Sequence, residues 1–217
     1  MSDATNIDQL FGQALAADDK LPVKQRAILQ AAFDLFAEQG FDHTTTKDIA
    51  QRAGVAEGTV YKRYKTKDEL LDAVLAPMAT SVVPSAATEF VELRLKGDYT
   101  DLHAYLQAIV DDRVDFVMGN YKYLKIVAER VLADSDFKTR MLKMVGPRVL
   151  TPIVENMGSL QAKGLLIDWP VDILAQLLIS TVFGLAGRII LLPQPVDVAA
   201  QKRMMVSFLE RGLAPEK

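Results

Sequence analysis

The sequence contains no cysteine and only two histidines, His43 and His103, among its 217 residues. Without cysteine, the chain has no disulfide, thiolate metal site, iron–sulfur cluster or cysteine nucleophile. Two histidines are too few for a metal centre built from several imidazoles. We therefore expect a protein with no metal site and no cofactor.

The chain also lacks a long apolar run. One long uncharged stretch, residues 173–187, has 15 residues and includes Gln176, Ser180 and Thr181. A membrane-spanning helix needs about 20 predominantly apolar residues, so this stretch predicts a buried helix. Residues 1–20 carry acidic side chains where a secretory leader has a cationic and then an apolar segment. The prediction is a cytoplasmic protein without a membrane partner.

Strand signals are missing as well, because apolar and polar residues do not alternate and Asn-Gly hairpin turns are absent. Apolar residues recur instead at helical spacing. The pattern predicts an all-α protein of about nine helices. They are expected at 23–39, as two short helices between 45 and 64, and at 67–83, 101–118, 121–132, 137–163, 171–192 and 197–211.

Three interruptions are predicted from local breakers: near Pro84, at Gly119-Asn120, and as a break or kink near Gly146-Pro147. Residues 85–96 are left unassigned. The first 20 residues leave two alternatives open, a loosely docked extra helix and a mobile tail.

Charge is distributed unevenly along the chain. The net charge is −3, yet residues 44–67 hold six basic and two acidic side chains. This window carries +4, so the remainder sums to −7. A cationic patch on an acidic body is typical of a protein that binds a polyanion at one place. A charge cluster is more often only a solvated helix face. The neighbouring residues must therefore distinguish a polyanion-binding surface from such a face.

Those residues form two short helices joined by a glycine turn. Thr45, with Asp48 three residues later, is a capping-box pattern, and Ala53-Gly54-Val55 provides the turn. In the second helix, Val60 and Tyr64 are one turn apart and are predicted to face the core. The cationic residues are then left on the solvent side. The arrangement predicts a helix-turn-helix with its second helix in the DNA major groove.

The segment from Arg26 to about Leu75 resembles the DNA-binding domain of the tetracycline-repressor (TetR) family. The resemblance is carried by Gly40-Phe41, Thr44-Thr45, Ile49-Ala50, Ala53-Gly54-Val55, Gly58-Thr59-Val60-Tyr61, Tyr64 and Lys67. It implies an N-terminal three-helix helix-turn-helix domain followed by a C-terminal helical ligand-binding and dimerisation domain. The expected boundaries are an extension at 1–20, the DNA-binding domain at 21–66 and the regulatory domain at 67–217.

The resemblance also implies contacts with double-stranded operator DNA. Thr45, Tyr61 and Lys67 would contact phosphates. Glu57, Gly58, Thr59 and Lys62 would face the bases, and Arg63 and Lys65 would give electrostatic support. Two residues depart from the family pattern. Thr46 stands where an aliphatic residue is usual, either as a further DNA contact or as a tolerated core substitution, and Ala56 stands where serine is a common helix cap.

The last two predicted helices carry apolar stripes that include small residues. The resemblance implies that they pair with their symmetry mates in a homodimer, although both stripes could instead pack into the monomer's own core. The candidate interface residues are Ile173, Leu177, Ser180, Phe183, Gly184, Gly187 and Leu191 in the first, and Met205, Phe208 and Leu209 in the second.

Helices between 101 and 163 would enclose a pocket for a small-molecule effector. The candidate lining residues are Tyr105, Ile109, Arg113, Phe116, Tyr123, Met144, Met157 and Trp169. Aromatic residues and methionines at helical spacing are more often plain core. Arg113 is either an anchor for an anionic ligand or, more commonly for a charge in an apolar stripe, paired with an acid such as Asp112, Glu129 or Glu155.

The leading hypothesis is a homodimeric transcriptional regulator, a repressor released from its operator by a small molecule. The alternative is a DNA-binding regulator controlled by a protein partner or by no ligand. An α-helical enzyme is a distant third, because no nucleophile motif lies near His103 and Walker and dinucleotide glycine patterns are absent. We expect no catalytic residues.

Overall fold

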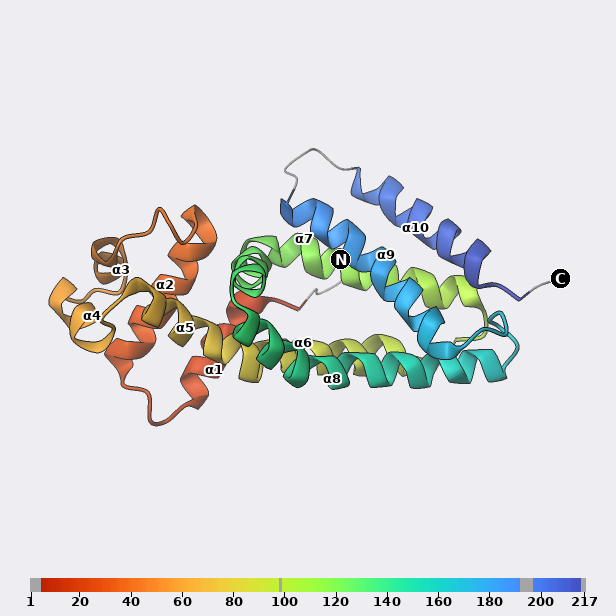
Figure 1. The fold of residues 1–217 in the computed structure, drawn as a ribbon, viewed down its shortest axis with the longest axis horizontal. Helices are drawn as coiled ribbons and strands as arrows, with labels where there is room; N and C mark the ends of the chain where they lie inside the picture. Colours follow the sequence, from red (N-terminus) through yellow and green to blue (C-terminus); the bar gives the residue numbers. More distant parts are fainter. Residues whose placement is uncertain (1–4, 98, 192–196, 216–217) are drawn as a thin grey trace. The chain divides into compact units, whose positions relative to one another are not determined.

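The computed structural model describes residues 5–97, 99–191 and 197–215, and all regular structure in these ranges is helical (Figure 1). The helices are α1 (Ile7–Ala17), α2 (Val23–Gln39), α3 (Thr46–Arg52), α4 (Glu57–Arg63), α5 (Lys67–Pro77), α6 (Val83–Phe90), α7 (Leu102–Ala133), α8 (Ser135–Ala162), α9 (Val171–Leu191) and α10 (Val198–Leu213). Two π-helical segments, η1 (Met78–Val82) and η2 (Val91–Leu95), make α5 and α6 parts of one helical stretch. The described residues thus form nine separate helices, which confirms the predicted all-α class.

The chain packs as two compact units. The helix-turn-helix unit comprises Asn6–Ser85 and Lys122–Met144, and the C-terminal unit comprises Thr5, Ala86–Tyr121 and the described residues from Val145 onward. Each unit therefore draws on separate parts of the chain. The domain boundaries expected after residues 20 and 66 stay a prediction.

The N-terminal segment contains a docked helix, the first of the two alternatives. Ile7, Phe11 and Leu15 of α1 are buried against other helices of the helix-turn-helix unit. The Phe11 ring stacks on Phe33 of α2 at 4.0 Å between centroids, and Phe33 stacks in turn on Tyr123 of α7 at 4.5 Å. This three-ring stack joins helices that lie far apart in sequence.

The predicted break at Gly119-Asn120 is wrong, because α7 continues through it to Ala133. Asn120 is buried, and its side-chain amide donates to the carbonyl oxygens of Phe116 and Thr5, each at 2.8 Å. The bond to Phe116 lies within the helix, and the bond to Thr5 reaches a distant segment. Tertiary packing thus outweighs the weak helix propensity of this pair.

The interruption near Pro84 is also wrong, since helix continues from Lys67 to Leu95. The ladder widens to π-helix over Met78–Val82, directly after Pro77 and before Pro84. Such local rearrangement accommodates residues that disturb an α-helical ladder. The break predicted near Gly146-Pro147 is absent, because α8 runs through Pro147 and Pro152, and the alternative of a kink stays a prediction.

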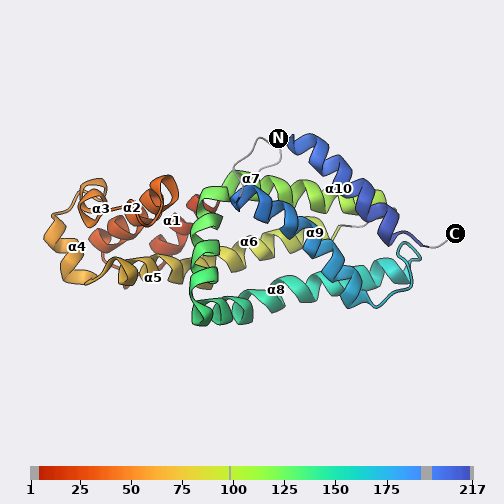
Figure 2. The same ribbon diagram turned by 45° about the horizontal axis from the view of Figure 1, so that its top comes forward.

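The core of the C-terminal unit brings together residues from α6, α7, α8, α9 and α10. Its fully buried members include Tyr105, Leu106, Met157 and Leu174. Helices α9 and α10 lie side by side (Figure 2), and the backbone N–H of Ile167 donates to the Leu213 carbonyl at 2.9 Å. This packing fixes which face of each of the last two helices remains exposed.

Two helical stretches, Lys67–Leu95 and Val171–Ile189, are long and apolar enough to cross a membrane. Length and composition alone are weak evidence, because core helices of soluble proteins pass the same test. Half of the most apolar window of Lys67–Leu95 is buried, against 22% in Val171–Ile189. Helix α9 therefore has an apolar surface that the described part of the chain does not cover.

Candidate nucleic-acid interface

Helix α3 begins with the predicted capping box. The Thr45 hydroxyl accepts from the Asp48 backbone N–H at 3.1 Å, and the Asp48 carboxylate accepts from the Thr45 N–H at 3.0 Å. The Thr45 hydroxyl also donates to that carboxylate at 2.6 Å. These hydrogen bonds hold the pKa of Asp48 below its usual range. The hydroxyl expected to meet a phosphate is thus engaged in starting α3.

The turn between α3 and α4 depends on glycine. Gly54 adopts φ +65°, in the left-handed region, and its N–H donates to the Gln51 carbonyl at 3.2 Å. The N–H of Val55 donates to the Ala50 carbonyl at 3.0 Å. Ala56 then stands at the N-cap of α4 without a side-chain hydrogen bond, as its residue type predicts.

Helix α4 buries the two residues predicted to face the core. Val60 is fully buried, and Tyr64, which directly follows the helix, is nearly so. The Tyr64 hydroxyl accepts from the side-chain amide of Gln25 in α2 at 2.9 Å. Ile49 and Ala50 of α3 are buried too. The two short helices are therefore fixed in orientation against the rest of the unit.

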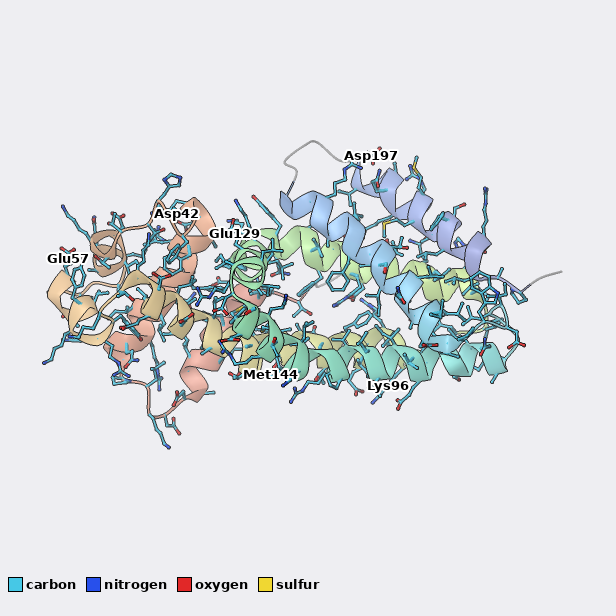
Figure 3. The ribbon with its side chains drawn as sticks, in the orientation of Figure 1. Asp42, Glu57, Lys96, Glu129, Met144 and Asp197 are labelled. Carbon is cyan, nitrogen blue, oxygen red and sulfur yellow. The ribbon has the colours of Figure 1, made fainter. Side chains whose placement is uncertain are left out.

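The opposite face of α4 is exposed. Glu57, Gly58, Tyr61, Lys62 and Arg63 are accessible to solvent, and Thr59 is half-buried. Figure 3 shows Glu57 at the start of α4 and Asp42 in the turn before α3. This face presents a phenol and two cations from one turn of helix, which suits contact with phosphates and base edges.

Thr46 links α3 to this exposed face. Its hydroxyl donates to a carboxylate oxygen of Glu57 at 3.3 Å and lies 2.9 Å from the Tyr61 hydroxyl. The residue is thus neither a core substitution nor an unattached side chain. Sequence reasoning missed this contact because the partners are 11 and 15 residues away and meet only through the angle between the two helices.

Lys67 is tied to the protein's own backbone. Its ammonium donates to the Phe41 and Asp42 carbonyls at 2.8 and 3.3 Å and lies 4.3 Å from the centroid of the Phe41 ring. The side chain is half-buried. This lysine therefore joins the start of α5 to the turn that precedes α3.

The other basic side chains of the predicted patch differ in their surroundings. Arg52 pairs with Glu38 of α2 at 2.8 Å. Lys47, Lys62, Arg63 and Lys65 are exposed. The positive charge presented to solvent is thus concentrated around α4 and the start of α3.

The apolar stripe of α9 is largely exposed. Ile173 and Leu177 are each exposed by about two fifths and Phe183 by 69%, while Ser180 and Gly184 are exposed and Gly187 is half-buried. The side chain of Leu191 lies outside the described residues. The exposed residues form an apolar face that the rest of the described chain leaves uncovered.

For α10, the predicted stripe needs a correction. Phe208 is 70% exposed, but Met205 and Leu209 are buried in the core of the C-terminal unit. Met204 is exposed instead, at 65%. Met204 and Phe208 are one turn apart, so the exposed edge of the stripe lies one residue earlier than expected.

The predicted pocket residues are divided between the two units. Tyr105, Ile109 and Met157 belong to the core of the C-terminal unit. Tyr123 and Met144 belong to the helix-turn-helix unit, where Tyr123 takes part in the ring stack. Trp169 is 46% exposed.

Arg113 has the intramolecular partner that its position in an apolar stripe favours. Its Nε donates to Asp112 at 2.8 Å, and its guanidinium lies 3.9 Å from the Phe90 ring centroid and 4.8 Å from that of Phe116. Asp112 also accepts from Nε of Arg94 at 2.8 Å. Burial lowers the pKa of Arg113, and Asp112 opposes that shift. Two arginines thus share one largely buried carboxylate.

Metal-binding clusters are a separate question. Over residues 5–97, 99–191 and 197–215, no group of three or more His, Cys, Asp or Glu side chains is placed to hold a metal ion.

Residues 28–74 match the model of the family described as bacterial regulatory proteins, tetR family. The HTH-type transcriptional repressor Rv3405c of Mycobacterium tuberculosis is 50% identical over 56 residues, which cover 26% of this chain and 30% of that protein. The uncharacterized HTH-type regulator YvkB of Bacillus subtilis is 24% identical over 180 residues, 80% of this chain and 89% of that protein. The chain thus spans less than a third of the mycobacterial relative.

Solved structures show the same fold. A putative transcriptional regulator from Saccharomonospora viridis in complex with choline has a TM-score of 0.68 and 18% identity, covering 88% of this chain and 97% of that one. The regulator FadR from Bacillus subtilis in complex with stearoyl-CoA has a TM-score of 0.60 and 20% identity, covering 86% and 97%. At these identities the likeness concerns the fold.

Proposed function

Because this chain belongs to the tetR family of bacterial regulatory proteins, we propose that it is a homodimeric repressor that binds operator DNA in the cytoplasm. A small molecule bound to the C-terminal unit would release it. The observation that carries the DNA-binding part is the exposed cationic face of α4, held in place by buried Val60 and Tyr64.

In this proposal, α4 enters the major groove. Lys62 donates to guanine, Thr59 contacts a thymine methyl and Glu57 accepts from the amino group of cytosine. Tyr61 and Arg63 contact phosphates beside them, and Gly58 admits the close approach of a base. The Thr46 hydroxyl supports the same face by orienting Tyr61 and Glu57.

In the proposed complex, Thr45 and Lys67 act mainly by holding the backbone around α3 in place beside the DNA. Thr45 presents the start of α3 to the DNA backbone while its hydroxyl caps the helix. Lys67 holds the turn before α3, so that its charge lies near the phosphate path without leaving the Phe41 carbonyl.

The homodimer is supported by the uncovered apolar face of α9 and α10. Ile173, Leu177, Phe183, Met204 and Phe208 all expose large apolar side chains there. Contiguous exposed apolar surface commonly marks a protein interface. Two copies also supply two recognition helices, which readers of this type place about 34–36 Å apart on successive major grooves.

The effector part of the proposal is supported by the two solved relatives. One holds stearoyl-CoA and the other choline, so this fold accommodates ligands of unrelated chemistry. The ligand would favour a state whose recognition helices no longer fit the operator. A coupling of about 1–3 kcal/mol is sufficient to change occupancy strongly.

The test is gel retardation of fragments from the chain's own promoter region by the purified protein. The variant is Tyr61→Ala with Lys62→Ala. The matched control is Tyr121→Ala with Lys122→Ala, the same adjacent pair of residue types, also exposed but in α7. We expect a complex at physiological salt that the first variant loses and the control keeps.

The salt dependence adds a second readout. Each lost phosphate contact lowers the slope of log K against log salt by roughly one. Equal binding by the wild type and the Tyr61/Lys62 variant across salt would contradict the DNA-binding proposal. Operator binding that no small molecule changes would favour control by a protein partner or by no ligand.

A further inference from the structure

Two buried polar atoms in the C-terminal unit have no hydrogen-bond partner among the residues that the structure describes. They are the hydroxyl of Tyr105 in α7 and the side-chain oxygen Oδ1 of Asn156 in α8. Tyr105 is fully buried. Most buried polar groups are paired, because leaving water without a new hydrogen bond is costly. These two atoms therefore require an explanation.

Asn156 and Tyr99, whose ring packs against Tyr105, bond to adjacent backbone carbonyls at the end of η2. The Asn156 amide donates to the Leu95 carbonyl at 2.6 Å. Tyr99 donates its hydroxyl to the neighbouring Arg94 carbonyl at 2.7 Å and packs edge-on against the Tyr105 ring, 5.3 Å between centroids. Residues 94 and 95 thus link Asn156 to Tyr99, and through the Tyr99 ring to Tyr105, within the C-terminal unit.

The surroundings are apolar and adaptable. Leu95, Leu106, Ile109 and Met157 belong to the same buried cluster as Tyr105. Methionine fills irregular space and readily changes its shape. Burial raises the pKa of Tyr105, so its hydroxyl remains neutral and available both to donate and to accept.

The chemistry of the two atoms defines what they would bind. Asn156 uses its amide N–H on Leu95, so the free atom is an acceptor and its partner must donate. A carboxylate would accept from Tyr105 but repel this oxygen. A cation would enter an apolar core whose nearby acid, Asp112, already serves two arginines. An uncharged group that both donates and accepts satisfies both atoms.

We propose that Tyr105 and Asn156 are the polar contacts of a site for an apolar molecule with an uncharged hydroxyl or primary amide head. This inference rests on the proposed function, since it gives the effector its chemical class. The apolar body of the ligand would replace contacts within the surrounding cluster, and its head would pair the two orphaned atoms.

The test uses decan-1-ol and decanoate at pH 8 as probes of equal chain length, with calorimetric titration of the full chain. We expect decan-1-ol to bind at one site per chain and decanoate at least tenfold more weakly. Tyr105→Phe should weaken decan-1-ol about tenfold without lowering the melting temperature, because the hydroxyl that it removes is unpaired in the free protein. The control Tyr121→Phe changes an exposed tyrosine of the same helix and should bind as the wild type does.

A second variant keeps the test valid if Tyr105→Phe fails to fold. Asn156→Leu, checked by circular dichroism, should also weaken decan-1-ol relative to decanoate. The proposal is overturned if decan-1-ol does not bind, if decanoate binds equally well, or if Tyr105→Phe binds decan-1-ol like the wild type. Gel retardation of the unliganded protein tests the DNA-binding proposal separately, since neither substitution lies in α4.

Discussion

Phe11 offers the sharpest test of how α1 is held. Its ring is fully buried and stacks on Phe33, which itself stacks on Tyr123. The substitution Phe11→Ala removes the first ring of this series and leaves the methyl group of alanine beneath Phe33. We expect α1 to loosen and the stability of the helix-turn-helix unit to fall.

The magnitude follows from burial and stacking. Replacing a fully buried phenylalanine by alanine costs about 3–5 kcal/mol, which includes the transfer of the ring and the cavity left behind. A stacked aromatic pair contributes roughly 0.5–1.5 kcal/mol beyond its buried area. We therefore expect the free energy of unfolding to fall by about 4 kcal/mol.

The assay is urea denaturation followed by circular dichroism, at one protein concentration for all variants because formation of the proposed dimer would change the measured stability. The control is Val23→Ala, which truncates an apolar side chain that is 79% exposed in α2 and should change stability by less than about 0.5 kcal/mol. A loss below about 1 kcal/mol for Phe11→Ala, at an unchanged denaturant slope, would refute the docking of α1.

Three further outcomes are expected. Gly54→Ala places a Cβ on a residue with φ +65°, so the free energy of unfolding should fall by about 1–2 kcal/mol in urea denaturation, whereas Gly58→Ala, with open space around its Cβ, should change it little. Thr45 holds the pKa of Asp48 below its usual range, so this carboxylate stabilises the fold above its unfolded pKa and loses that contribution as pH falls through the folded pKa. Thr45→Val should raise the Asp48 midpoint in an NMR titration, and an unmoved midpoint would contradict the capping box. Asp112→Asn leaves Arg94 and Arg113 without their shared carboxylate and should cost about 3 kcal/mol, while Arg113→Met keeps Asp112 paired with Arg94 and should cost less. Equal losses in urea denaturation would argue against the shared carboxylate.

The features that the sequence predicts correctly are those determined by nearby residues. The capping box at Thr45 needs only Asp48, and the turn at Gly54 needs only its own φ angle. The inward pair Val60 and Tyr64 follows from helical spacing within α4. Such patterns involve residues within one or two helical turns of each other, so a single sequence is sufficient to predict them.

The predictions that failed depend on distant residues. Asn120 stands inside α7 while bonded to Thr5, a residue 115 positions away, so a local breaker is stabilised by tertiary contact. An apolar stripe on α10 has two edges, and only the packing of the C-terminal unit decides that Met205 and Leu209 face inward.

The hydrogen bonds of Thr46 bear on how operator preference changes during evolution. Because one hydroxyl restrains both Tyr61 and Glu57, these side chains would have less rotamer freedom to lose in the proposed complex with DNA. An aliphatic residue at this position would leave both side chains free to adapt to each base step. A Thr46→Val chain should therefore bind a panel of operator variants with a narrower spread of affinities. Substitution of this one residue in α3 would therefore change the operator specificity of α4 without any contact of its own with the bases.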